Sequence, residues 1–197
     1  MTPPRVVAVL VAVLGAVAPA YAFDIDETFH KGALIFSVEG GYGEQDSLGD
    51  QFQSELRFWN AGVRLGLVPF APIGSGPWRG AIEVGLEPFF QRYTDPRPAF
   101  FAGLAAVGRY HFLGLGRVVP FIEVAGAAGG TDLKIPEIDS SFTFLLFGGV
   151  GASVFITDRA AVYAGYRYQH VSNGHTSEPN RGFESQTGVV GFSYFFR

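Results

Sequence analysis

Three residues near the C-terminus have side chains that could together cleave an ester. His170 and Ser172 are separated by one residue, and Glu184 follows twelve residues after the serine. Because side chains alternate between the two faces of a β-strand, His170 and Ser172 share a face, about 7 Å apart. A symmetric antiparallel hairpin centred on Ser177 sets Glu184 opposite His170, with about 4.5 to 5.5 Å between their Cβ atoms. A base that activates a serine works best when a carboxylate orients it, so the pattern predicts a Ser-His-Glu triad.

The residues after the serine could stabilise the negative charge that develops on the substrate carbonyl. Acyl transfer requires hydrogen-bond donors at this position, the oxyanion hole. The side-chain amide of Asn173 is one candidate, and the backbone N–H of Gly174 or His175 is a second. We interpret His175 as a loop histidine rather than a metal ligand. The chain has no cysteine, which excludes a thiolate nucleophile or thiolate metal site, and neither metal nor cofactor is expected.

The first 22 residues have the pattern of a secretory signal peptide. Arg5 precedes an apolar run, and Ala20-Tyr21-Ala22 forms a small-x-small cleavage site. The run is shorter than the roughly 20 residues that a membrane-spanning helix requires. We therefore predict a signal peptide at 1–22 and a single domain at 23–197. The formal net charge is −4 and no basic patch is present, so a nucleic-acid partner is not expected.

The composition and the period of the apolar residues predict an all-β fold. The 197 residues include 27 glycines and 20 phenylalanines, which suits no helical bundle. Most of the expected strands have nine or more residues, a length typical of strands that cross a bilayer at a tilt. Eight strands are expected, at about 32–43, 52–68, 79–92, 99–112, 119–130, 141–156, 160–172 and 183–196.

The alternation within these strands separates an apolar face from a charged one. In the third, Ile82 and Val84 share a face, whereas Glu83 and Glu87 share the other. A transmembrane antiparallel β-barrel with a lipid-facing apolar exterior and a small polar interior accounts for this arrangement. Eight strands leave an interior only wide enough for side chains, which argues against a pore. The expected interior network of mixed charge comprises Glu39, Arg64, Glu83, Glu87, Arg109, His111, Glu123, Arg167 and Gln169.

The same alternation places the expected triad on the exterior. His170 and Ser172 share a face with Tyr166 and Tyr168, and Glu184 shares its face with apolar residues of the last strand. If both termini are periplasmic, the triad lies at the outer end of the barrel. Ionisable groups on a lipid-facing surface are costly, by about 2 to 4 kcal/mol at the midplane and less near the interface, so they seldom persist without a use.

The C-terminal residues also resemble a known enzyme family. The run Tyr-Arg-Tyr-Gln-His-Val-Ser-Asn-Gly at 166–174, followed by Glu184 twelve residues after the serine, is similar to the signature of the lipid A 3-O-deacylases, the PagL-type outer-membrane enzymes. The resemblance implies an esterase that removes the acyl chain at position 3 of lipid A. It also implies Ser172 as nucleophile, His170 as base, Glu184 as its orienter and Asn173 in the oxyanion hole.

This interpretation has two alternatives. One is a structural or adhesive outer-membrane barrel in which the same residues only meet lipid headgroups, and the other is a soluble periplasmic lipid-binding barrel. For the favoured interpretation, the expected location is the outer membrane and the expected partners are lipopolysaccharide and the surrounding membrane lipids. The barrel-assembly machinery is expected during biogenesis, because the chain ends in three aromatic residues, of which Phe196 is penultimate, before Arg197.

Overall fold

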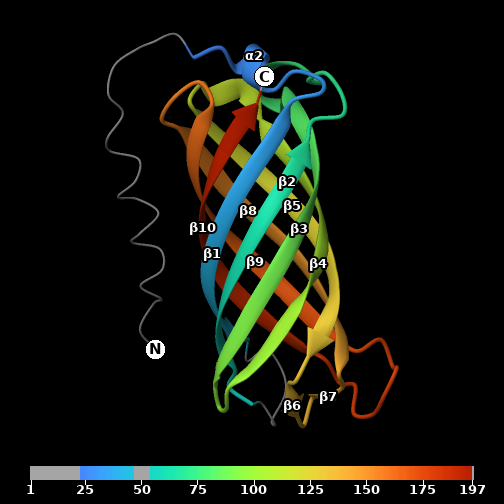
Figure 1. The fold of residues 1–197 in the computed structure, drawn as a ribbon. Helices are drawn as coiled ribbons and strands as arrows, with labels where there is room; N and C mark the ends of the chain where they lie inside the picture. Colours follow the sequence, from blue (N-terminus) through green and yellow to red (C-terminus); the bar gives the residue numbers. More distant parts are fainter. Residues whose placement is uncertain (1–22, 47–53, 197) are drawn as a thin grey trace.

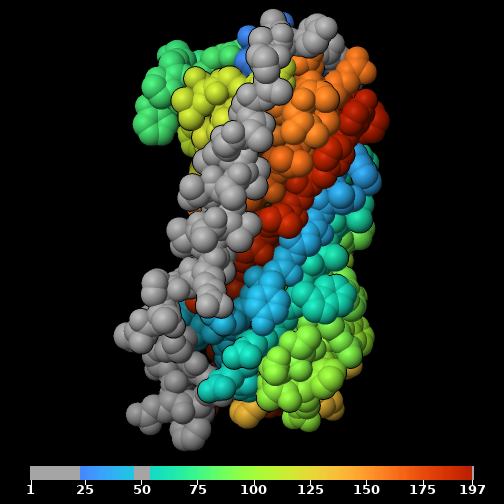
Figure 2. Space-filling model, turned by 90° about the vertical axis from the view of Figure 1, so that its left-hand side faces the viewer, coloured from blue at the N-terminus to red at the C-terminus, as the bar shows by residue number. Residues whose placement is uncertain are grey.

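A computed structural model of the chain describes residues 23–46 and 54–196. Eight antiparallel strands close into a barrel in the order β1-β10-β9-β8-β5-β4-β3-β2 (Figure 1). The closing pair β1 and β10 lies side by side across one face of the surface (Figure 2). The predicted fold class is therefore confirmed. The strands are β1 (Leu34–Gln45), β2 (Arg57–Leu67), β3 (Gly80–Asp95), β4 (Ala99–Phe112), β5 (Val118–Thr131), β8 (Phe142–Phe155), β9 (Ala160–Ser172) and β10 (Phe183–Phe196).

The connections include elements that the sequence pattern did not predict. A two-stranded hairpin, β6 (Lys134–Ile135) and β7 (Ile138–Asp139), lies within the expected break between β5 and β8. The short helix α2 (Ile25–Thr28) precedes β1, and Asp24 caps it by accepting hydrogen bonds from two backbone N–H groups. The single turns η2 (Gly76–Trp78) and η3 (Leu113–Leu115) lie in loops. The second strand was expected at 52–68 but begins at Arg57.

The two ends of the barrel carry different parts of the chain. Helix α2 and the end of β10 lie at one end, which we call the terminal end, and β6, β7 and the β9–β10 loop lie at the other, the site end (Figure 1). The predicted signal peptide at 1–22 lies outside the described residues, as does Arg197. Within the described ranges, no helix has the length and apolarity needed to cross a membrane.

The predicted interior network is present in the middle of the barrel. Arg167 joins two buried carboxylates, since its Nε donates to Glu123 at 2.7 Å and its Nη2 to Glu39 at 2.8 Å. Arg64 likewise donates to Glu83 and Glu87, both at 3.1 Å. Buried charges persist only when they are paired and hydrogen-bonded, as these are. All nine residues predicted for the network are buried.

The interior also holds an apolar cluster at each end, which the expectation of a small polar interior did not include. At the terminal end, Phe29 from the segment after α2 packs against Phe155 and Phe195. At the site end, a larger cluster includes Tyr93 and Phe183. An eight-stranded barrel is too narrow to hold bulk water, so inward side chains must fill it and are not required to be polar near the ends.

Candidate active site

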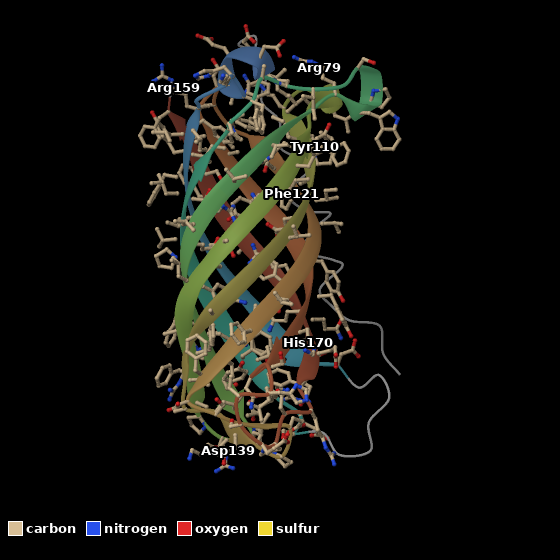
Figure 3. The ribbon with its side chains drawn as sticks, turned by 90° about the vertical axis from the view of Figure 1, so that its right-hand side faces the viewer. Arg79, Tyr110, Phe121, Asp139, Arg159 and His170 are labelled. Atoms are coloured by element: carbon tan, nitrogen blue, oxygen red, sulfur yellow. The ribbon has the colours of Figure 1, made fainter. Side chains whose placement is uncertain are left out.

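The strand register brings His170 and Glu184 directly opposite each other. They are Cα partners in the β9–β10 ladder, as the symmetric hairpin predicted. The His170 Nδ1 lies 3.0 Å from Glu184 Oε1. Their side chains are 42% and 48% exposed, whereas the adjacent Gln169 and Ser185 are buried inside. His170 therefore projects from the outer wall near the site end, far from Arg79 and Arg159 at the other end (Figure 3).

The use of Nδ1 in this contact sets the chemistry of the other ring nitrogen. When the Nδ1–H donates to the carboxylate, the neutral imidazole keeps its lone pair on Nε2. A lone pair on Nε2 can accept a proton, and the carboxylate then stabilises the resulting imidazolium. This is the arrangement that a general base beside a nucleophile requires.

Ser172 lies on the same outer face, at the last position of β9. It is half-buried and is paired with Phe144 of β8. Within the described residues, its hydroxyl forms no hydrogen bond with the imidazole. In structures without substrate such bonds are often long and tighten only in the complex. The structure thus brings the predicted base and its carboxylate into contact and places the predicted nucleophile beside them.

The side chain of Asn173 is buried and holds the β9–β10 loop together. Its amide nitrogen donates to the carbonyl of Ser177 at 2.9 Å and to the hydroxyl of the same residue at 3.0 Å. Its amide oxygen accepts the His175 N–H at 3.0 Å, and its backbone N–H donates to Asn180 Oδ1 at 2.8 Å. The Asn173 amide and the His175 N–H, both predicted as oxyanion donors, are therefore engaged within the loop.

The remaining predicted donor is the backbone N–H of Gly174. No acceptor for this N–H is found among the described residues, and Gly174 is exposed. The backbone of Gly174 has a φ of +62°, which glycine adopts without strain. A Cβ at this position would lie 3.1 Å from the Phe144 ring, so the close packing of the loop on β8 also favours glycine.

Gly182 is a further residue of the site, which sequence reasoning missed. Its φ is +70°, and a Cβ there would lie 2.9 Å from His170 Cε1 and 3.3 Å from Nε2. The glycine thus leaves room for the imidazole in the position where it meets Glu184. The signal in the sequence was the Arg-Gly-Phe run directly before β10, where a positive φ is common in a turn.

The β6–β7 hairpin supports the loop that carries these residues. The Glu137 carboxylate accepts hydrogen bonds from the Ser54 N–H at 2.9 Å, the Ser54 hydroxyl at 2.7 Å and the Gln45 amide at 3.1 Å. Its backbone carbonyl accepts the Arg181 N–H at 2.9 Å, and Ile138 forms a β-bridge with Asn180. The hairpin therefore links the β1–β2 connection to the loop between Ser172 and Glu184.

An apolar wall surrounds the candidate triad on the outer surface. On β8, Phe144 and Leu146 pair with Ser172 and His170, and Leu146 is 56% exposed. Such a continuous exposed apolar surface is expected of a barrel that faces lipid. We call it the outer apolar wall, and it comprises Phe144, Leu146, Val150, Tyr166 and Tyr168.

The fold and the site define a membrane-type barrel that carries a serine and a histidine–carboxylate pair on its outer wall. Within the described residues, no three His, Cys, Asp or Glu side chains are grouped to hold a metal ion. The family model of the lipid A 3-O-deacylase (PagL) matches residues 32–193. The chain belongs to the lipid A 3-O-deacylase family.

Solved structures show the same fold at low sequence identity. The crystal structure of the outer membrane enzyme PagL is similar with a TM-score of 0.61 and 18% identity, over 80% of this chain and 97% of that one. Neisserial surface protein A (NspA) is similar with a TM-score of 0.57 and 16% identity, over 84% of this chain and 100% of that one. No curated protein sequence matches. Because an enzyme and a surface protein share this barrel, the fold alone does not assign the chemistry.

Proposed function

We propose that the chain is a serine esterase that hydrolyses the acyl ester at position 3 of lipid A, in the outer leaflet of the outer membrane. One observation carries the proposal: His170 Nδ1 lies 3.0 Å from Glu184 Oε1. His170 is two residues before Ser172 in the chain and lies on the same outer face. Family membership supports the substrate class, and the apolar exterior supports the location. The ester of an acylated saccharide lies at the boundary between its acyl chains and its headgroup, and the triad lies near one end of the apolar wall.

The proposed reaction has two steps. The Ser172 hydroxyl attacks the ester carbonyl while His170 Nε2 takes its proton, and the Gly174 N–H donates to the oxyanion. The imidazolium, stabilised by Glu184, then protonates the departing sugar oxygen, leaving an acyl-enzyme. Water, deprotonated by His170, releases a 3-hydroxy fatty acid and restores Ser172. The outer apolar wall would hold the acyl chain that is removed.

In this mechanism Asn173 is a positioning residue. Its hydrogen bonds to Ser177, His175 and Asn180 fix the turn that presents the Gly174 N–H. The oxyanion donor we propose is thus the backbone of Gly174 rather than the Asn173 side chain, because that side chain is already engaged.

The test is mass spectrometry of lipid A from cells that express the chain or its Ser172→Ala variant. Loss of one hydroxyacyl mass with the wild type alone supports the proposal. Ser75→Ala is a matched control, because Ser75 lies in a loop and its side chain makes no capping hydrogen bond. Unchanged lipid A with correctly inserted wild-type protein would instead favour a structural or adhesive barrel.

The proposed location has its own measurement. An outer-membrane barrel should remain with the outer-membrane fraction and migrate differently on electrophoresis before and after heating. A soluble periplasmic barrel would leave with the periplasm, and that result would contradict the membrane assignment.

A further inference from the structure

The site end contains a cavity that the mechanism above does not use. It has a volume of about 720 Å³, within the range of small-molecule sites. Three segments of the chain line it. They comprise Thr131, Asp132 and Lys134 at and after the end of β5, residues 139–142 from β7 to the start of β8, and Thr176 and Ser177 of the β9–β10 loop. Asp139 marks its place beyond His170, toward the extremity of the barrel (Figure 3).

The cavity is close to the candidate nucleophile. Phe142 lines it and packs edge-on against Phe144, with 5.4 Å between ring centroids. Phe144 is the cross-strand partner of Ser172. Two residues of strand span about 7 Å, so Phe142 lies about that far along β8 from the partner of Ser172, in the direction away from Leu146 and Val150 of the outer apolar wall.

The groups in the cavity suit a saccharide. Asp132 and Asp139 provide carboxylate acceptors, and Asp132 already accepts the Phe100 N–H at 2.6 Å. The Ser141 hydroxyl can donate and accept hydrogen bonds, whereas the Thr176 hydroxyl already donates to the Asn173 carbonyl and is left as an acceptor. The exposed ring of Phe142 provides an apolar face on which the C–H face of a sugar can lie. Lys134 is the one cation among the lining residues and is 3.6 Å from Asp139, so the net charge disfavours a bare phosphate.

We infer that this cavity binds the saccharide headgroup of the lipid whose acyl ester Ser172 cleaves. The inference rests on the proposed function. With the sugar in the cavity and the acyl chain on the outer apolar wall, the ester between them falls at Ser172. The cavity would then supply the discrimination between an acylated saccharide and a simple acyl ester, because a simple ester has nothing to place there.

The test compares two substrates with purified full-length protein in detergent micelles. Lipid A is one, and p-nitrophenyl octanoate, which has an acyl ester and no sugar, is the other. The variants are Asp139→Ala, which removes a carboxylate, and Ser141→Trp, which places a bulky ring among the lining residues. Asp158→Ala is the matched control, because Asp158 is also paired with a basic residue but lies in the β8–β9 turn next to Arg159, at the terminal end (Figure 3).

Both cavity variants should lower kcat/KM for lipid A by about tenfold or more, mainly through KM, as expected for the loss of one or two hydrogen bonds. Hydrolysis of p-nitrophenyl octanoate should change less than about twofold. Equal losses on both substrates, or no loss on lipid A, would overturn the inference. Ser172→Ala abolishing both activities supports the proposed triad independently of the cavity.

A binding measurement separates the cavity from the catalysis. Acyl-free glucosamine disaccharide should bind the Ser172→Ala variant in saturation-transfer NMR, and adding Ser141→Trp should remove the signal. This result is expected even if the chain hydrolyses neither substrate, which would refute the proposed function alone. Absence of disaccharide binding, or binding unaffected by Ser141→Trp, would refute the headgroup site.

Discussion

Replacing Gly182 with alanine should misplace the imidazole of His170, while its folding cost should match that of alanine at another glycine of positive φ. The Cβ would lie 2.9 Å from His170 Cε1, whereas carbon atoms in contact prefer about 3.5 to 4.0 Å. The ring must therefore move by about 0.6 Å or more. Its bond to Glu184 is 3.0 Å long, so a shift of this size away from the carboxylate breaks it.

The expected magnitude follows from these distances. A displacement approaching 1 Å in a reacting group lowers turnover by about 100-fold. The positive φ of +70° adds a folding cost of about 1 to 2 kcal/mol for alanine. Gly76→Ala is the matched control, because Gly76 has a φ of +57° and a Cβ there would have no atom within 4 Å.

The assay is hydrolysis of lipid A in micelles by both variants, together with urea unfolding of each. Gly182→Ala should lose about 100-fold in kcat and Gly76→Ala less than about threefold, with similar losses of stability. If Gly182→Ala is folded and retains activity within threefold of the control, the argument that this glycine positions His170 is refuted.

Three other variants test the remaining parts of the structure. Glu184→Gln should lower kcat by about 100-fold. This loss is smaller than the loss expected for a buried triad carboxylate, because the Glu184 side chain is half exposed. A kcat near the wild-type value would contradict the proposed role of Glu184. Glu137→Gln should loosen the β6–β7 hairpin, measured as faster proteolysis within 132–141 and as lower activity on both ester substrates; unchanged proteolysis would count against the link. Arg167→Met should lower the free energy of unfolding in urea by about 3 to 5 kcal/mol, because Glu39 and Glu123 stay buried and lose this partner. A free energy of unfolding equal to that of the wild type would show that the ion pairs of Arg167 are dispensable.

The features that could be predicted from the sequence depend on local alternation. A period of two assigns each residue to one face, so the exterior position of His170 and the interior position of Arg167 followed directly. The β9–β10 loop spans residues 173–182, and the assumption that the two strands pair symmetrically about Ser177 placed Glu184 opposite His170, as the register shows.

The features that could not be predicted depend on contacts between distant segments. The role of Glu137 requires Ser54, which is 83 residues away, and no periodic pattern connects the two. The side chain of Asn173 was expected to donate to the substrate oxyanion, but its hydrogen-bond partners lie in the same loop. The alternation of residues along a strand gives no information on the conformation of a loop, so these bonds could not be predicted. The two apolar clusters inside the barrel were missed because a lumen-facing phenylalanine and a lipid-facing one look alike in sequence.

The alternation of β9 has a further consequence for how this protein can change. Each residue that could contact substrate is flanked in the chain by residues that fill the interior, as His170 is by Gln169 and Val171. Substitutions on the outer wall therefore leave the packed interior untouched, and the reverse is also true. The two faces can diverge separately, so a new substrate preference, or even the whole catalytic set, could be transferred to the outside of another eight-stranded barrel without redesigning its core.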